Sequence, residues 1–120
     1  MKTLVVGASI NPARVSHSAI HRLVENDHDV LAYGLREGTV SGIPIITDRD
    51  QITDTDIHTV TLYVGPARQP DLIDWVTSLK PSRVIFNPGT ENPAFEAQLL
   101  GEGIDSVRAC TLVMLSIGMY

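Results

Sequence analysis

The chain has 120 residues, of which 43% are hydrophobic and 19% are charged, and it carries a net charge of −5 and one cysteine. These values fit one packed domain over residues 1–120. They argue against a disordered chain, an internal disulfide and a nucleic-acid binder, which needs a broad basic surface. No apolar run is long enough to span a membrane and no signal peptide precedes the first strand, so we expect a cytoplasmic protein without a membrane partner.

The predicted elements begin with a β-branched strand, residues 3–6, followed by a helix that Ser16 opens and that has its apolar residues on one face. Further strands are predicted at residues 30–33, 59–64, 83–86 and 104–109, and further helices at residues 70–79 and 93–100. Less regular structure is expected for residues 34–42 (a loop), 43–46 (an extended edge piece at best, because of Pro44), 48–56 (one short helix) and 111–119 (a short covering helix or coil).

Strands alternate with helices along the chain, and this alternation predicts an α/β fold: a doubly wound parallel sheet of about five strands with helices on both faces. In such sheets ligands bind at the carboxyl ends of the strands, near the point where the strand order reverses. The loops expected to meet there are residues 8–15, 34–42, 65–69 and 87–92.

The first of these loops has the features of an anion site. A strand–loop–helix turn directs backbone N–H groups and the positive end of a helix at one spot. Gly7 permits a tight reversal, Ser9 and Asn11 add side-chain donors, and Arg14 offers a fork for a phosphate. The three-glycine dinucleotide fingerprint and the Gly-Lys-Ser/Thr of a P-loop are both missing. The alternative is an ordinary strand-to-helix turn with a solvated arginine.

The end of the second strand narrows the choice of ligand. A nicotinamide cofactor normally needs an acidic residue there to hold the ribose hydroxyls. This strand ends in Ala32-Tyr33-Gly34, and the nearby positive charge is Arg36, next to Glu37. A positive residue fits a ribose phosphate better than a free ribose. The two common nucleotides that carry such a phosphate are NADP and coenzyme A.

The motif Gly7-Ala8-Ser9-x-x-Pro12-x-Arg14-x-Ser16 resembles that of the small stand-alone CoA-binding proteins, which are similar to the CoA-binding domain of the succinyl-CoA synthetase α subunit. The resemblance covers essentially the whole chain and includes three later blocks: Val64-Gly65-Pro66, Asn87-Pro88-Gly89-Thr90-Glu91-Asn92 and Cys110-Thr111-Leu112. One departure lies after the second strand. Many relatives have a Pro-Val-Asn-Pro-like run there, whereas this chain has Gly34-Leu35-Arg36-Glu37.

The resemblance implies a Rossmann-like fold with coenzyme A or an acyl-CoA lying along the strand ends. It places the pyrophosphate on Gly7, Ala8, Ser9 and Arg14, and Arg36 near the adenosine phosphate. It also places Val64 to Pro66 along the adenine side. The full set of residues expected to contact the ligand is Gly7, Ala8, Ser9, Asn11, Pro12, Arg14, Ser16, Tyr33, Arg36, Val64, Gly65, Pro66, Asn87, Pro88, Gly89 and Glu91.

No nucleophile, base and orienting group can be assembled from the sequence, which favours a binding module over an enzyme. Cys110 has no histidine placed to activate it and is expected to be a buried small hydrophobe. His17 and His21 lack a third ligand, so we expect no metal site. Glu91 is either the best candidate acid or a first-turn carboxylate of the next helix.

Three interpretations follow from these observations. The first is binding of coenzyme A or an acyl-CoA in a non-catalytic or regulatory role. The second is an NADP-dependent or other nucleotide-dependent enzyme with an atypical Rossmann phosphate loop. The third is a regulatory partner that senses the ligand for another protein. Both a protein partner and a homo-oligomer are compatible with the sequence.

Overall fold

The computed structural model describes residues 1–120. In chain order its elements are β1 (Lys2–Val6), α1 (Val15–Glu25), β2 (Asp29–Tyr33), β3 (Thr39–Val40), β4 (Ile43–Ile46), the 3-10 turn η1 (Arg49–Gln51), β5 (Thr59–Leu62), the 3-10 turn η2 (Pro66–Arg68), α2 (Pro70–Ser78), β6 (Arg83–Phe86), α3 (Pro93–Gly101), β7 (Asp105–Arg108) and α4 (Thr111–Ser116).

The strands form one sheet in the order β3-β4-β2-β1-β5-β6-β7. All neighbours pair in parallel except β3 and β4, which are antiparallel. The strand β1 is central: β2 and β4 follow on one side of it, and β5, β6 and β7 follow on the other. The predicted doubly wound α/β fold is therefore confirmed. The predicted count of about five strands is too low, because β3 and β4 extend one edge.

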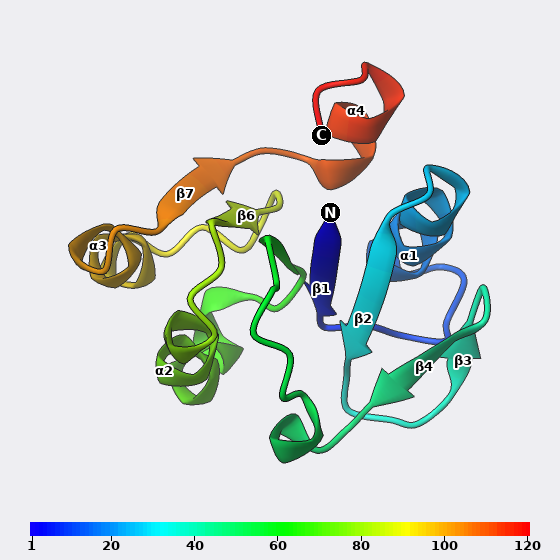
Figure 1. Cartoon of the computed structure of the whole chain (residues 1–120), viewed down its shortest axis with the longest axis horizontal. Coiled ribbons are helices and arrows are strands. Elements are labelled where there is room, and N and C mark those ends of the chain that lie inside the picture. Colours follow the sequence, from blue (N-terminus) through cyan, green and yellow to red (C-terminus); the bar gives the residue numbers. More distant parts are fainter.

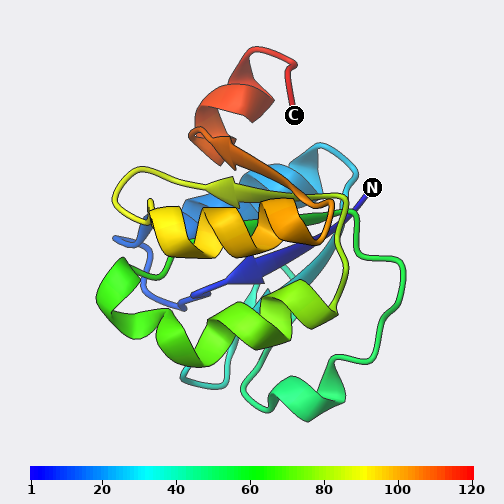
Figure 2. The same cartoon turned by 90° about the vertical axis from the view of Figure 1, so that its left-hand side faces the viewer.

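Side chains of the strands alternate between two buried layers. Leu4 and Val6 belong to a cluster with Phe95 of α3 on one face, whereas Val5 packs with Ile20 of α1 on the other. Figure 1 shows α2 and α3 on the first face and α1 and α4 on the second, and Figure 2 shows α2 and α3 in front of the sheet. Helices on both faces were predicted, and this prediction is confirmed.

The chain between β2 and β5 departs from the predicted alternation of strands and helices. A hairpin forms there: Thr39 pairs with Pro44, and the turn residues Ser41 and Gly42 have φ values of 50° and 81°. The strand β4 then pairs with β2 through Ala32 and Ile45. Only the short turn η1 precedes β5, so the predicted helix within residues 48–56 is reduced to Arg49–Gln51.

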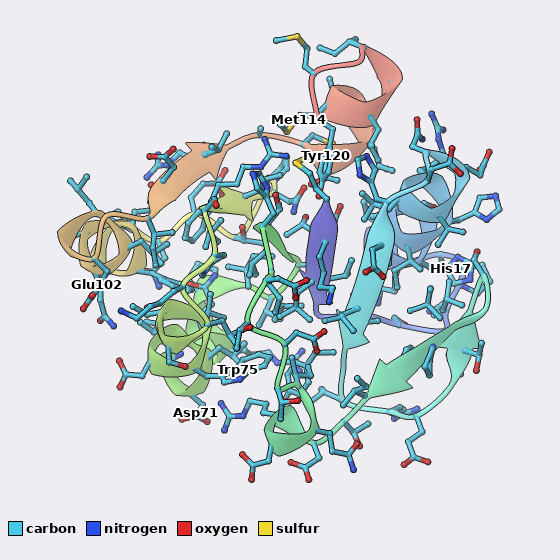
Figure 3. All side chains as sticks on the ribbon, in the orientation of Figure 1. His17, Asp71, Trp75, Glu102, Met114 and Tyr120 are labelled. Atoms are coloured by element: carbon cyan, nitrogen blue, oxygen red, sulfur yellow. The ribbon has the colours of Figure 1, made fainter.

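The tail of the chain folds back over the α1 face, as a short covering helix. Leu115 of α4 is buried in the cluster that contains Val5. Beyond α4, the hydroxyl of Tyr120 lies 2.5 Å from Thr3 Oγ1, and the Arg83 guanidinium lies 4.7 Å from the Tyr120 ring centroid. Figure 3 shows Tyr120 beside the start of β1. None of the helices has the length and apolar character that crossing a membrane would require.

Candidate functional site

Four loops meet at the carboxyl edge of the sheet. We call them the β1 loop (residues 7–14), the β2 loop (34–38), the β5 loop (63–69) and the β6 loop (87–92). The N–H groups of Gly7 and Ala8 both donate to the carbonyl oxygen of Tyr33 at 2.9 Å, which joins the β1 loop to the end of β2. The parallel registers of β1 with β5 and of β5 with β6 bring the other loops alongside. The β1 and β5 loops flank the reversal of strand order, where ligands of such sheets bind.

Two glycines allow these loops to approach one another. Gly7 has a φ of 95°, and a Cβ on it would lie 3.0 Å from the carbonyl oxygen of Tyr63. A Cβ on Gly34 would overlap the carbonyl oxygen of Ala8. A side chain at either position would push the β1 loop away from its neighbours.

The amino end of α1 has no capping side chain. Arg14 occupies the N-cap without a side-chain capping bond, and no acidic residue lies in the first turn. The backbone N–H groups of Ser9, Ile10, Val15 and Ser16 donate to no acceptor within the protein. An anion at this point would satisfy such donors and interact with the positive end of an 11-residue helix.

The start of α3 has the capping bond and the first-turn carboxylate that the start of α1 lacks. There the Oδ1 atom of Asn92 accepts the N–H of Phe95 at 3.3 Å, and Glu96 places a carboxylate in the first turn. Both features stabilise a helix start without any ligand. Their absence at α1 is therefore a local property of residues 9–18 and not of the fold as a whole.

Polar side chains within the β1 loop hold its shape. Ser9 Oγ accepts the N–H of Asn11, and Asn11 Oδ1 accepts the N–H of Ala13, each at 3.0 Å. The Ser9 hydroxyl hydrogen and the Asn11 Nδ2 hydrogens are not used by these bonds, so both residues keep the donors that the sequence predicted. Pro12 and Arg14 are exposed at the surface of the same loop.

A buried glutamine that the sequence analysis did not single out joins the β5 and β6 loops. The Nε2 atom of Gln69 donates to the carbonyl oxygens of Val64 and Thr90, and its Oε1 atom accepts from Asn92 Nδ2, all at 2.8 Å. Gln69 is completely buried. Its only signal in the sequence is its place immediately before Pro70, at the start of a helix.

Asn87 is a framework residue of the same edge. Its Nδ2 atom donates to Thr61 Oγ1 at 2.7 Å and to the carbonyl oxygen of Leu62 at 2.9 Å. Its Oδ1 atom accepts the N–H of Thr111 at 2.9 Å. Both hydrogens of the amide are thus used inside the protein. A direct ligand contact by Asn87 remains a prediction.

Glu91 closes the β6 loop. Its Oε1 atom accepts the N–H of Gly89 at 2.8 Å. Because Asn92 is the N-cap of α3, Glu91 precedes the helix, and its interpretation as a first-turn carboxylate is wrong. Its role as a candidate acid remains a prediction.

The residues predicted to line the adenine side, Val64 to Pro66, lie in the β5 loop. The ring of Tyr33 lies 4.9 Å from that of Trp75, centroid to centroid, and Figure 3 shows Trp75 between α2 and the η1 segment. Val64 packs against the same apolar cluster as Tyr33. Five further predicted contact residues of the β2, β5 and β6 loops are exposed, namely Arg36, Gly65, Pro66, Pro88 and Gly89.

Cys110 is half-exposed and not buried as the sequence suggested. It is the N-cap of α4 and makes no capping bond. The hydroxyl of nearby Tyr63 is buried without a hydrogen-bond partner, and burial raises the pKa of Tyr63 to about 12. This phenol is therefore neutral near pH 7 and does not act as a base for the thiol.

An open, doubly wound parallel sheet with these loops at its carboxyl edge defines a Rossmann-like α/β domain. Residues 1–116 match the sequence profile of a family described as "CoA binding domain". The chain belongs to this family, which confirms the resemblance carried by the opening motif. Among curated proteins, none is similar enough to the chain to count as a match.

Solved structures share this fold over almost the entire chain. One, described as an uncharacterized protein, is 42% identical and has a TM-score of 0.92, and the match covers 99% of this chain and 97% of that one. A Thermus thermophilus protein, cell-free ID.343, is 21% identical with a TM-score of 0.87, covering 99% and 90% of the two chains. A hypothetical protein from Pyrococcus horikoshii OT3 is 22% identical with a TM-score of 0.85, covering 96% and 81%. The latter two likenesses concern the fold alone.

Proposed function

We propose that this chain binds coenzyme A or an acyl-CoA at the carboxyl edge of its sheet. The observation that carries the proposal is the uncapped amino end of α1, where unused N–H groups and Arg14 offer a site for a pyrophosphate. Membership of the CoA binding domain family supports coenzyme A as the nucleotide.

The charge around this edge supports an anionic ligand despite the acidic chain. Arg14, Arg36 and Arg68 are exposed in the β1, β2 and β5 loops, and none of them takes part in an ion pair. Guanidinium groups form bidentate bonds with phosphates. The last residues of β2, Ala32 and Tyr33, are not acidic, and the first charge after them is that of Arg36, which Glu37 follows. This order favours a phosphorylated ribose. NADP shares that phosphate and is the second candidate ligand.

We infer a binding role without catalysis. Glu91 is the one carboxylate among the predicted contact residues, and it accepts a hydrogen bond from the backbone N–H of Gly89. The half-exposed thiol of Cys110, at the N-cap of α4, makes no capping hydrogen bond. A regulatory role, in which the bound coenzyme changes contacts with a protein partner or a second copy, fits this arrangement.

A thermal scan tests the ligand. Coenzyme A at 100 times its Kd is expected to stabilise the folded chain by about 2.7 kcal/mol, which raises the Tm by roughly 10 °C for a domain of this size. NAD, which lacks a ribose phosphate, should leave the Tm unchanged. A shift with NADP but not with coenzyme A would favour the second candidate. A shift with NAD and none with coenzyme A would contradict the proposal.

Replacement of Arg14 by alanine is expected to weaken coenzyme A binding by about 1.5–3 kcal/mol, because a charge-assisted contact is lost. The free energy of unfolding should change little, since the Arg14 side chain is exposed and makes no capping bond. Calorimetric titration measures the affinity. The matched control is Arg22→Ala, in the last turn of the same helix, which should bind like the unmodified chain. Equal affinities of Arg14→Ala and Arg22→Ala for coenzyme A would show that Arg14 is a solvated arginine without a ligand contact.

A further inference from the structure

Gln69 is an unusual residue for a fully buried position. A glutamine side chain loses its hydration on burial, and this loss is costly unless each polar atom finds a partner. Here both do: Nε2 donates twice, to Val64 and Thr90, and Oε1 accepts once, from Asn92. Two carbonyl acceptors require the NH₂ group on that side, so the orientation of the amide is fixed.

The three partners of Gln69 come from two different loops. Val64 lies in the β5 loop, whereas Thr90 and Asn92 lie in the β6 loop, more than twenty residues later. The strand register joins β5 and β6 only as far as Leu62 and Phe86. Beyond that point, the Gln69 amide crosses from one loop to the other.

We propose that Gln69 is a positioning residue that fixes the β5 and β6 loops to each other, so that they form one rigid wall of the coenzyme site. The inference rests on the proposed function, because these loops carry Val64 to Pro66 and Asn87 to Gly89. A wall held in its binding conformation reduces the entropy lost when a ligand orders it. The proposed anion contacts belong to the β1 loop and the first turn of α1. Gln69 makes no hydrogen bond to either segment, so these contacts should depend on it less than the β5 and β6 loops do.

The test compares the unmodified chain with Gln69→Met, which keeps the length of the side chain and removes its hydrogen bonds. The matched control is Gln98→Met, which removes the bonds of Gln98 Nε2 to Asp74 and Thr77 between α2 and α3. Amide hydrogen exchange of the ligand-free proteins is expected to rise at least tenfold in both the β5 and β6 loops of Gln69→Met. The β1 loop and the first turn of α1 should exchange as before, and Gln98→Met should leave all three loops unchanged.

Calorimetric titration with coenzyme A, well below the melting temperature of each variant, supplies the second readout. Gln69→Met is expected to raise the Kd about tenfold, and Gln98→Met to leave it unchanged. Should Gln69→Met fail to fold, Asn92→Ser carries the test. Serine keeps the α3 cap but removes the donor to Gln69 Oε1. Asn92→Ser should raise amide exchange in the β6 loop, and it should also raise the Kd for coenzyme A.

The outcomes separate this inference from the proposed function. If the unmodified chain does not bind coenzyme A, the proposed function fails, and the exchange data still decide whether Gln69 joins the loops. If the unmodified chain binds and the folded variants bind equally well, the positioning role is overturned. It is also overturned if exchange in Gln69→Met rises in one loop alone, or if exchange in either variant rises across the whole chain.

Discussion

Asn87→Leu is expected to lower the free energy of unfolding by about 3 kcal/mol, because each buried polar group left without a partner costs about 1–3 kcal/mol. Leucine fills a similar volume but cannot replace the three hydrogen bonds of the amide. The carbonyl oxygen of Leu62 and the N–H of Thr111 lose a partner in a buried region. Thr61 Oγ1 keeps one, since it also lies 2.8 Å from Thr111 Oγ1.

Urea unfolding measures this loss. The matched control is Asn26→Leu, at the exposed carboxyl end of α1, where the amide makes one bond to the carbonyl oxygen of Arg22. That change should stay within about 0.5 kcal/mol. A loss below about 1 kcal/mol for Asn87→Leu would show that the edge repacks easily and that Asn87 is not part of its framework.

Gly34→Ala is expected to destabilise the chain by about 2–3 kcal/mol, in the range of overpacking substitutions. The added methyl group would overlap the carbonyl oxygen of Ala8 and lie 3.1 Å from Ile45 Cγ2. Backbone atoms cannot move aside as a flexible side chain can. The β1 loop must therefore shift, so coenzyme A binding should weaken as well.

The matched control makes the same chemical change where space is open. Gly101, the last residue of α3, has no atom within 4 Å of an added Cβ. Gly101→Ala should therefore stabilise the chain, by about 0.5–1 kcal/mol, because alanine loses less conformational entropy in a helix. Thermal or urea unfolding of both variants gives the comparison. Equal effects of the two substitutions would contradict the close approach of the β1 and β2 loops.

The main strands and helices could be predicted because each carries a local signal, such as the continuous apolar run of β1 or the Asn92-Pro93 start of α3. The β3–β4 hairpin could not. Its turn is Ser41-Gly42, not the usual Asn-Gly, and Pro44 argued against a strand. Tertiary pairing of Ile45 and Ile46 with β2 outweighed these local preferences. Between β4 and β5, the short helix predicted within residues 48–56 is only the 3-10 turn η1.

The loops of the candidate site were predictable in their positions but not in their internal bonding. Strand ends located the loops, because parallel strands place their carboxyl ends at one edge. The sequence did not indicate that Asn87 would bond to Thr111, or Gln69 to Thr90, since these partners lie 24 and 21 residues apart. Glu91 as a first-turn carboxylate was inconsistent with the predicted Asn92 cap, which the structure has, because a residue before the N-cap lies outside the helix.

Under the proposed function, the uncapped start of α1 is a compromise between stability and ligand binding. A serine, threonine or aspartate at position 14 would cap the helix and stabilise the ligand-free protein by about 1 kcal/mol. This chain has arginine there and forgoes that gain. Selection for stability alone would favour the capping residue. A descendant that no longer needed the ligand would be free to drift toward it, so position 14 should be among the first to change once binding is lost.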